Sequence, residues 1–513
     1  MTEFYTFFGG TWNEVLVSGY SNGKKFHRRV PYTPFLFVPG KGDYRTIKGK
    51  SLDRVDFDSM QEARDFIKRY SEVANFSVFG FTNFPYVYIY ENFKNQEVDK
   101  SLIKVGNFDI ETDSQNGYGN TQLADREIIT ITLKQLGDKV IHTLGYKDYE
   151  IKEPELLEMK MQGYKFIHHK CANERELLLT FISLWKDYAF DAVTGWNIEG
   201  FDIPYIIKRI IITLSEAHAK ELSPFGILNK RSIEMYGKEQ DLFDIVGIAT
   251  LDYMQVYKKF SFTNEESYSL NYISGKVLNA TKLDYSEYKT LARLYNENYN
   301  KFLDYNVIDV WRVEQINNYL DYLDLVYTIA YYAQVNYVDS FTTVRVWDVM
   351  IHNYLLDQNI AIPGGTSESK LGQIAGGFVK EPQIGKHAAA MSFDFTSLYP
   401  KLIEMLNISP DTLMGSFDPI KTEMSGSYSG ILPPGPSKIL NGELDQYRQD
   451  MIDNNVCISG RGNVFTRDKQ GFIPALMSDL FKQRKQYTVL EEEQDELLAK
   501  INAELHKRNI NLD

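Results

Sequence analysis

The first hundred residues carry short runs in which apolar and polar positions alternate. Residues 11–20, 34–38 and 86–90 follow this two-residue period, which predicts β-strands. Residues 59–70 instead repeat apolar positions every three or four residues, which predicts a helix. We therefore expect residues 1–103 to form a small α+β domain.

A different pattern begins at Lys104. The sequence predicts a strand at residues 105–111, a hairpin turn at Gly137-Asp138, a helix at residues 174–188 and a strand at residues 191–196. Such mixed strands and helices are typical of α/β architecture. A long region with helical spacing, from Tyr299 to about Val335, predicts more than one helix and closes a second domain, residues 104–335.

The last third of the chain is more varied. Glycine-rich segments at residues 363–366 and 372–377 precede an apolar strand predicted at residues 388–393, which leads into a helix at residues 401–406. A Ser/Gly/Pro-rich tract at residues 415–442 predicts a surface loop or insertion.

The final predicted helix begins at about Ile473. Its apolar residues stand near heptad spacing, so this stripe needs a partner surface. The partner is either the core of this chain or a second helix on another chain. The residues of the stripe are Leu490, Leu497, Ile501 and Leu505.

Composition narrows the class of protein. With 513 residues, 43% of them hydrophobic, the chain can bury several cores and form three or more structural domains. Two cysteines without a Cys/His cluster exclude a disulfide framework and a typical zinc module, which fits a reducing cytoplasm. The first residues lack a basic region followed by an apolar core, and no stretch approaches eighteen apolar residues, so we expect neither secretion nor membrane insertion. The net charge of −13 gives no support for long-range attraction to nucleic acid.

Acidic residues in three separate motifs suggest chemistry. In Phe108-Asp109-Ile110-Glu111-Thr112, the two acids are two positions apart on a strand, so they point to the same face and can share a metal ion. In Tyr305-Asn306-Val307-Ile308-Asp309, four-residue spacing on a helix puts the phenol and the carboxylate on one face. Exposure at a sheet edge and an ordinary helical pair are the alternatives.

The second motif in chain order, between these two, is Gly195-Trp196-Asn197-Ile198-Glu199-Gly200-Phe201-Asp202-Ile203-Pro204, where a strand ends and a helix begins. Taken alone, Asp202 would be an N-cap. Taken together, four carboxylates can hold two divalent ions about 4 Å apart while a tyrosine hydroxyl orients the attacking water. This combination indicates a two-metal phosphodiesterase.

These motifs, F-D-I-E, N-x-x-x-F-D and Y-x-x-x-D in this order, resemble those of DnaQ-like proofreading exonucleases with a ribonuclease-H-like fold. The resemblance implies catalytic roles for the tyrosine and the acids, metal ligation by the acids, and a DNA-supporting role for Asn197. Phage relatives place an aromatic residue near the primer terminus at the position of Tyr118, although a buried tyrosine is an equal alternative. The residues with implied catalytic roles are Asp109, Glu111, Asp202, Tyr305 and Asp309.

A further motif, Asp394-Phe395-Thr396-Ser397-Leu398-Tyr399-Pro400, resembles the first palm motif of family B DNA polymerases, D-x-x-S-L-Y-P. Gly376-Gly377 resembles the DNA-contacting G-G/A motif upstream of it. The resemblance implies that Asp394 is a catalytic metal ligand, that Ser397 and Leu398 contact the triphosphate, and that Tyr399 packs under the sugar. Arg484 resembles a fingers residue that meets the γ-phosphate. A plain N-capped helix is the alternative.

The resemblance also implies a domain order. Residues 336–375 would return to the N-terminal domain, residues 376–470 would form the N-terminal part of the palm, and residues 471–513 would form the first part of helical fingers. Thr488 departs from the family, because phage relatives tend to have lysine there. The later K-x-x-x-N-S-x-Y-G and D-T-D motifs are not found. We therefore expect either one chain of a split polymerase, completed by a C-terminal chain, or a truncation.

The function implied is replication of phage DNA in the cytoplasm of a bacterial host. The chain would be a 3′-5′ proofreading exonuclease with two Mg²⁺ ions, or Mn²⁺, and the N-terminal part of a DNA polymerase. Expected partners are a single-stranded 3′ end, primer-template DNA, a dNTP, the C-terminal polymerase chain, a sliding clamp and a single-strand-binding protein. A non-catalytic replisome scaffold and a ribonuclease-H-like nuclease acting on RNA are alternatives.

Overall fold

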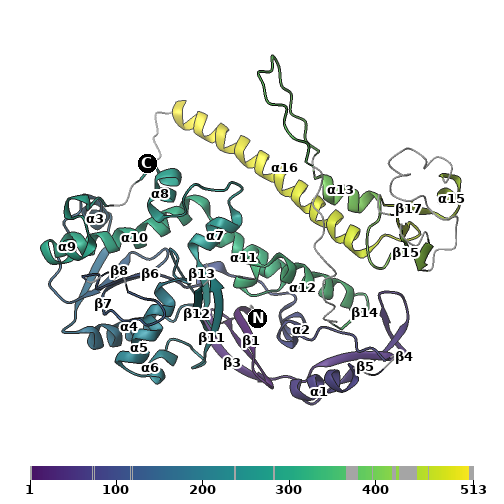
Figure 1. Cartoon of the computed structure of the whole chain (residues 1–513), viewed down its shortest axis with the longest axis horizontal. Coiled ribbons are helices and arrows are strands. Elements are labelled where there is room, and N and C mark those ends of the chain that lie inside the picture. The colour runs from purple at the N-terminus through teal and green to yellow at the C-terminus, as the bar shows by residue number, and fades with distance from the viewer. Residues whose placement is uncertain are drawn as a thin grey trace. The chain divides into compact units, whose positions relative to one another are not determined.

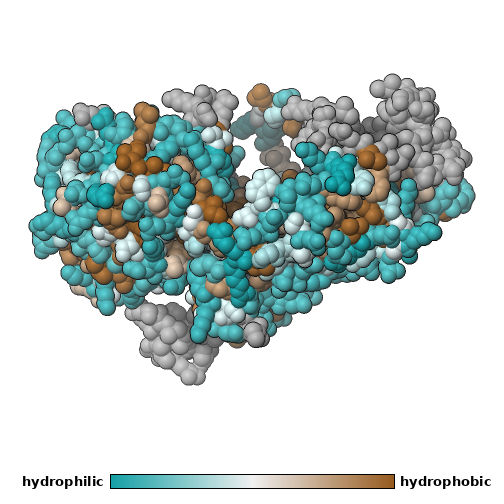
Figure 2. Space-filling model, turned by 90° about the horizontal axis from the view of Figure 1, so that it is seen from below, coloured by the Kyte–Doolittle hydropathy of each residue, from teal (hydrophilic) through white to brown (hydrophobic). Residues whose placement is uncertain are grey.

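The chain forms two compact units in the computed structural model, Met1–Leu36 with Arg54–Asn353 and Phe37–Asp53 with Tyr354–Asp513 (Figure 1). On the face shown in Figure 2, hydrophilic residues predominate and apolar residues form separate patches. In the described ranges, no helix is long and apolar enough to cross a membrane. The structure describes residues 3–71, 73, 76–115, 117, 119–235, 238–280, 283–364, 379–395, 397–418, 423–426, 448–459 and 462–507.

The first unit opens with an antiparallel sheet in the order β1-β2-β3. Its second turn is Asn22-Gly23, with φ angles of 50° and 75°. Asn-Gly suits this two-residue hairpin because both residues tolerate the left-handed conformation. The helix predicted at residues 59–70 is confirmed as α1, and Ser59 caps it by accepting a hydrogen bond from the Glu62 N–H. The bounds are β1 (Glu3–Gly10), β2 (Glu14–Ser21), β3 (Lys24–Pro31) and α1 (Met60–Tyr70).

The strand predicted at residues 86–90 is wrong, because this segment is the helix α2 (Phe84–Phe93). Its β-branched and aromatic residues favour a strand locally. Pro85, however, stands in the first turn, where proline suits a helix. The helix packs against β1, with the rings of Phe8 and Tyr86 edge to face at 4.9 Å. Tertiary packing therefore overrides local propensity.

A six-stranded sheet in the order β13-β10-β6-β7-β8-β9 forms the centre of the first unit. Strands β6, β7 and β8 are antiparallel neighbours, whereas β10 runs parallel to β6 and to β13. The predicted hairpin at Gly137-Asp138 is confirmed between β7 and β8. The bounds are β6 (Val105–Thr112), β7 (Ile128–Gln135), β8 (Val140–Gly145), β9 (Lys165–Lys170), β10 (Ala192–Gly195) and β13 (Ala249–Asp252).

Helices cover the two faces of this sheet differently. On one side, α4 (Glu174–Tyr188) and α5 (Asp202–Thr213) pack on Phe108 and Ile110 of β6 to form the main core. On the other side lies α10 (Tyr299–Leu320), which contacts β6, β7 and β8 (Figure 1). Because neighbouring residues on a strand point to opposite faces, Asp109 and Glu111 face α10.

Asp191 links the N-terminal sheet to the six-stranded sheet. This fully buried carboxylate accepts hydrogen bonds from Thr6 Oγ1 at 2.8 Å and Tyr20 Oη at 2.9 Å. It also accepts one from the Lys104 backbone N–H at 2.9 Å and forms a 2.9 Å salt bridge with Lys25 Nζ. Three donors from the N-terminal sheet and one from the residue before β6 thus compensate one buried charge.

The region predicted as several helices from Tyr299 to about Val335 is confirmed. It forms α10 and α11, separated at Asp321, whose φ angle of 53° ends α10. Helical and hairpin elements complete the unit. Their bounds are α3 (Pro154–Met161), α6 (Glu216–Lys220), β11 (Leu228–Met235), β12 (Lys238–Ile245), α7 (Tyr253–Phe260), α8 (Leu270–Leu278), α9 (Leu291–Glu297), α11 (Tyr322–Ala333) and α12 (Thr343–Leu356), with short 3-10 turns at Lys100–Leu102, Ser286–Tyr288 and Tyr337–Phe341.

The second unit combines two small sheets, ordered β14-β4-β5 and β16-β15-β18-β17, with helices. Asn407 fastens the second sheet, since its amide donates to the carbonyl oxygens of Thr466 and Lys469 and its Oδ1 accepts from Gly471 N–H. The long predicted C-terminal helix is confirmed as α16. The bounds are β4 (Phe35–Thr46), β5 (Ser51–Asp56), β14 (Ile360–Ala361), α13 (Leu398–Met405), β15 (Leu413–Asp418), β16 (Glu423–Gly426), α15 (Arg448–Asp453), β17 (Val456–Ile458), β18 (Asn463–Thr466) and α16 (Phe472–Lys507).

Two predictions fail in this unit. Residues 388–393 form no strand, because a strand requires a paired neighbour and no described residue pairs with them. Their apolar side chains are exposed, Phe393 at 88%. The tract at residues 415–442 is not simply a loop, since its start forms the β15–β16 hairpin. Its remaining residues and the glycine-rich residues 372–377 lie outside the described ranges.

Candidate active site

Asp109 and Glu111 occupy the face of β6 that α10 covers. Both side chains are partly buried, and their cross-strand partners on β7 are Thr132 and Thr130. Asp109 Oδ2 accepts a hydrogen bond from Asn306 Nδ2 of α10 at 2.6 Å. The strand therefore presents two carboxylates to the same helix, as the D-x-E spacing predicts.

Asp202 stands at the start of α5 but does not cap that helix. Its Oδ1 instead accepts a hydrogen bond from the Ile110 N–H at 3.0 Å, so this carboxylate lies beside β6 between Asp109 and Glu111. Burial raises the pKa of Asp202 well above its usual value, and the charges of Asp109 and Glu111 raise it further. The N-cap interpretation of Asp202 is therefore wrong.

Tyr305 and Asp309 lie four residues apart on α10, and both are buried. Burial raises the pKa of Tyr305, and the carboxylates of Asp309, Glu111 and Asp109 raise it further. The Tyr305 hydroxyl therefore stays protonated at neutral pH. Its ring packs edge to face on Tyr285 at 5.2 Å. These interactions bring the tyrosine and the acids of the first and third motifs together.

The four acids offer only oxygen atoms as metal ligands, and such ligands suit divalent cations such as Mg²⁺ and Mn²⁺. Burial first, and the charges of Asp109 and Glu111 next, raise the pKa of Asp202, and a divalent cation would stabilise the ionised form of such neighbouring carboxylates. In the described part of the chain, no three acidic, histidine or cysteine side chains form a group that could hold a metal ion.

The loop between β10 and α5 is hydrogen-bonded to a residue that the motifs did not identify. Asp252, buried at the end of β13, accepts hydrogen bonds from the N–H groups of Asn197 and Glu199, each at 3.1 Å. Burial raises the pKa of Asp252 to about 6. Asn197 itself is exposed and has a left-handed φ of 64°. The only sequence signal for Asp252 was an acid at the end of an apolar strand.

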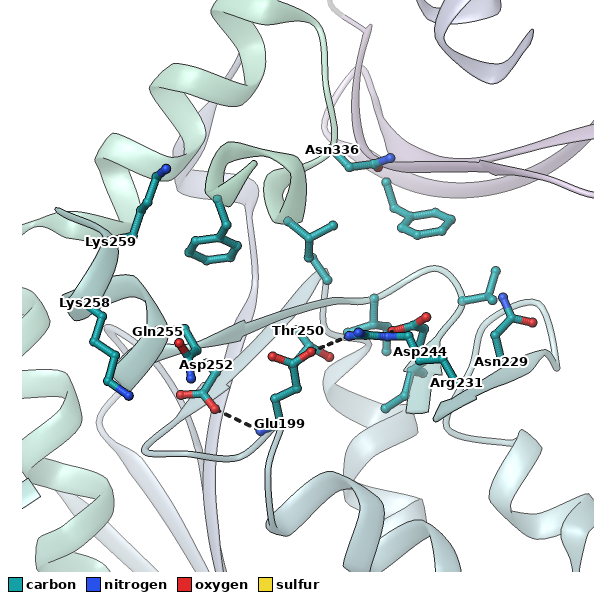
Figure 3. Close-up of a pocket in the computed structure, with 17 residues that line it drawn as sticks. Glu199, Asn229, Arg231, Asp244, Thr250, Asp252, Gln255, Lys258, Lys259 and Asn336 are labelled. Carbon is teal, nitrogen blue, oxygen red and sulfur yellow. Dashed lines mark hydrogen bonds and ion pairs between the residues drawn. The ribbon is translucent and has the colours of Figure 1, made fainter. Parts of the chain in front are cut away.

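A pocket of about 760 Å³ adjoins this loop (Figure 3). Glu199 and Asp252 line it, and Glu199 forms a 2.5 Å ion pair with Arg231 of the β11–β12 hairpin. The hairpin is tied to α5 as well, through a 2.9 Å salt bridge between Lys208 and Asp241. None of the acids on β6, α10 or the start of α5 lines this pocket. The carboxylate site is thus separate from it.

Most described residues of the palm-like motif in the second unit are exposed. Asp394 is exposed, and Ser397 has a left-handed φ of 58° without a side-chain cap on α13. Leu398 and Tyr399 are exposed too, Tyr399 at 77%. Arg484 lies exposed on α16, which packs against α13.

Among the described residues, no hydrogen bond or ion pair joins the Asp394 side chain to Ser397, Tyr399 or Arg484. The predicted DNA contacts Tyr118, Gly376 and Gly377 lie outside the described residues.

Comparison with known proteins identifies the family. Residues 86–273 match the exonuclease domain of DNA polymerase family B, and residues 337–506 match DNA polymerase family B. The chain belongs to DNA polymerase family B, which confirms the resemblance drawn from the motifs. Tyr305 and Asp309 lie between the two matched ranges.

Two phage proteins align with nearly all of the chain. It is 33% identical over 518 residues to the DNA-directed DNA polymerase of Escherichia phage RB69, covering 96% of this chain and 54% of that protein. It is 31% identical over 508 residues to the DNA-directed DNA polymerase of Enterobacteria phage T4, covering 95% and 54%. The DNA polymerase of Thermococcus litoralis is 24% identical over 337 residues, covering 61% and 16%. The chain spans about half the length of the phage relatives.

Proposed function

We propose that this chain is a 3′-to-5′ exonuclease that removes mismatched nucleotides from DNA. The observation that carries the proposal is the convergence of three elements: Asp202 of α5 hydrogen-bonds to β6 between Asp109 and Glu111, and Tyr305 of α10 lies in the field of those acids and of Asp309. The family B exonuclease match over residues 86–273 supports this reading.

Asp109, Glu111, Asp202 and Asp309 are the residues that would hold two Mg²⁺ or Mn²⁺ ions. When bound, such ions supply an activated water and stabilise the leaving 3′-oxygen. Tyr305, protonated at neutral pH, holds the attacking water through its hydroxyl. Asn197, exposed on the loop before α5, contacts the single-stranded 3′ end together with Tyr118.

We infer a second role for the second unit, as the N-terminal part of a polymerase site. Asp394 would hold catalytic metal, Ser397 and Leu398 the dNTP triphosphate, Tyr399 the sugar and Arg484 the γ-phosphate. Gly376 and Gly377 would contact primer-template DNA. The family B match over residues 337–506 and the packing of α13 on α16 support this role.

Nucleotide addition by this site requires further polypeptide that supplies the remaining palm carboxylate. The support is the apolar segment at residues 388–393, which is exposed and unpaired among the described residues. A complementary C-terminal polymerase chain would pair with it. A sliding clamp and a single-strand-binding protein complete the expected partners, in the cytoplasm of a phage-infected bacterium.

The test compares the parent chain with its Asp109→Ala/Glu111→Ala variant on 3′-mismatched primed DNA and on the matching RNA, with Mg²⁺. We expect the parent alone to shorten the DNA primer. If the parent shortens neither substrate, the chain is a non-catalytic scaffold. If it shortens RNA faster than DNA, the result favours a ribonuclease.

Adding dNTPs to the same reactions tests the second role. We expect no primer extension by this chain alone and extension after a complementary C-terminal polypeptide is added. Extension by the chain alone contradicts the need for that polypeptide.

A further inference from the structure

Asn306 is a fully buried residue of the Tyr305–Asp309 motif, and its side chain contacts both β6 and β7. It stands between Tyr305 and Val307 on α10, and its side chain is fully buried against the sheet. Asn306 Nδ2 donates to Asp109 Oδ2 at 2.6 Å. Asn306 Oδ1 accepts from the Thr132 hydroxyl, and Thr132 is fully buried too.

We call the hydrogen-bonded chain Thr132–Asn306–Asp109 the relay, and the chemistry of its groups fixes the direction of each hydrogen bond. An ionised carboxylate can only accept, so Asp109 must face the amide nitrogen of Asn306. The carbonyl oxygen of that amide then faces Thr132, which must donate. Thr132 stands directly across from Asp109 on the neighbouring strand β7. The acceptor-only carboxylate therefore determines which end of the amide it meets, and the Thr132 hydroxyl satisfies the other end.

The position of α10 does not depend on this relay. Further along the helix, Glu314 forms a buried ion pair with Lys134 of β7 and accepts a 3.0 Å hydrogen bond from the Gly137 N–H. Asn107 of β6 donates to the Val310 carbonyl oxygen at 2.7 Å. Because these contacts already hold α10 on the sheet, the Asn306 side chain is left to act on the Asp109 carboxylate.

We propose that Thr132 and Asn306 are positioning residues that hold the Asp109 carboxylate in the orientation for binding a divalent cation. This inference rests on the proposed exonuclease function and adds two residues to it. Carboxylates that bind metals are themselves held by outer hydrogen bonds, and loss of such a partner typically weakens metal affinity about 10- to 100-fold.

The test measures Mn²⁺ binding to the full chain by isothermal titration calorimetry, without DNA. Asn306→Ala and Thr132→Val should each weaken Mn²⁺ binding about 10- to 100-fold. Thr132→Ser, which restores the hydroxyl, should recover most of the affinity. Because both residues act through one contact, Thr132→Val/Asn306→Ala should be no weaker than Asn306→Ala alone.

Thr130→Val is the matched control. Thr130 is equally buried on β7 and stands across from Glu111, but its hydroxyl donates to the Leu144 carbonyl oxygen at 2.7 Å. This variant loses a buried hydrogen bond without touching the relay, so its Mn²⁺ affinity should equal that of the parent. Parental affinity in Asn306→Ala overturns the proposal, as does equal weakening in Thr130→Val.

The same titrations separate this proposal from the proposed function. If the parent binds Mn²⁺ and Asp109→Ala/Glu111→Ala does not, the carboxylate site stands and the relay variants decide the positioning role alone. If the parent neither binds Mn²⁺ nor shortens primers, the exonuclease function fails and the relay fails with it. Thermal unfolding of each variant without metal distinguishes weakened binding from lost folding.

Discussion

The exonuclease-like acids of the first unit and the palm-like motif of the second unit are both recognised from short acidic motifs, but their surroundings differ. In the first unit, Asn306 of α10 donates to Asp109 of β6, and the Ile110 N–H of β6 donates to Asp202 of α5. Around Asp394, the preceding apolar segment is exposed and the acid has no hydrogen bond or ion pair to another described residue. The motif alone does not organise a site, because the neighbouring elements hold the side chains.

The largest effect is expected from removing one charge from the carboxylate site around Asp109. Asp202→Asn keeps an oxygen that can accept from the Ile110 N–H but loses the negative charge. We expect release of the 3′-terminal nucleotide to fall roughly 10³-fold or more, since catalytic groups that act as a unit fail together. Asp187→Asn, an exposed acid on α4, is the control and should leave the rate unchanged.

The buried ion pair that holds α10 tests the scaffold of the carboxylate site. Lys134→Met leaves Glu314 charged and buried, and should lower the free energy of unfolding by about 3–5 kcal/mol. The double variant Lys134→Met/Glu314→Leu removes both charges and should recover most of that loss. Urea unfolding of both variants measures the difference. A double variant as unstable as Lys134→Met would mean that packing, rather than charge, causes the loss.

The pKa of Asp252 makes the loop before α5 sensitive to pH. Since burial raises this pKa to about 6, the folded state favours the protonated acid, and the associated stability falls as pH rises from about 4 through about 6. Asp252→Asn does not titrate. Its free energy of unfolding relative to the parent should therefore rise by about 2–3 kcal/mol across that window and stay level above it. A constant difference contradicts the raised pKa.

The smallest expected effect lies in the second unit. Asp394→Ala should change the free energy of unfolding by less than about 0.5 kcal/mol, because the side chain is exposed. Urea unfolding followed by circular dichroism measures it. A loss above about 1 kcal/mol would mean that Asp394 is already held by its surroundings, and the two regions would differ less than described.

Sequence reasoning recovered the elements whose periodicity was long and regular. The helices α1, α4, α10 and α16 and the strand β6 follow from spacing alone. It failed at residues 86–90, where packing on β1 outweighs a strand-like composition. Local patterns cannot report such long-range contacts.

For the same reason, the sequence predicted the site residues that lie within one element but not the contacts between elements. The motif spacing places Asp109 with Glu111 and Tyr305 with Asp309, because each pair lies within one element. That Asp202 bonds to β6 instead of its own helix depends on a partner 92 residues away in sequence. Asn306 carried no separate signal and Asp252 only that of an acid at the end of an apolar strand, since a buried amide or acid is recognised only from its partners. The roles assigned to these residues stay predictions.

The contacts of Asp191 bear on how this polypeptide can be divided. A fragment that starts at Lys104 would contain all five exonuclease residues, yet it would lack Thr6, Tyr20 and Lys25. Asp191 would then keep only the Lys104 backbone N–H among the donors described above. A buried charge stripped of its partners is strongly destabilising. Anyone cloning the nuclease as a separate module should therefore include the N-terminal sheet, although every recognisable motif lies after it.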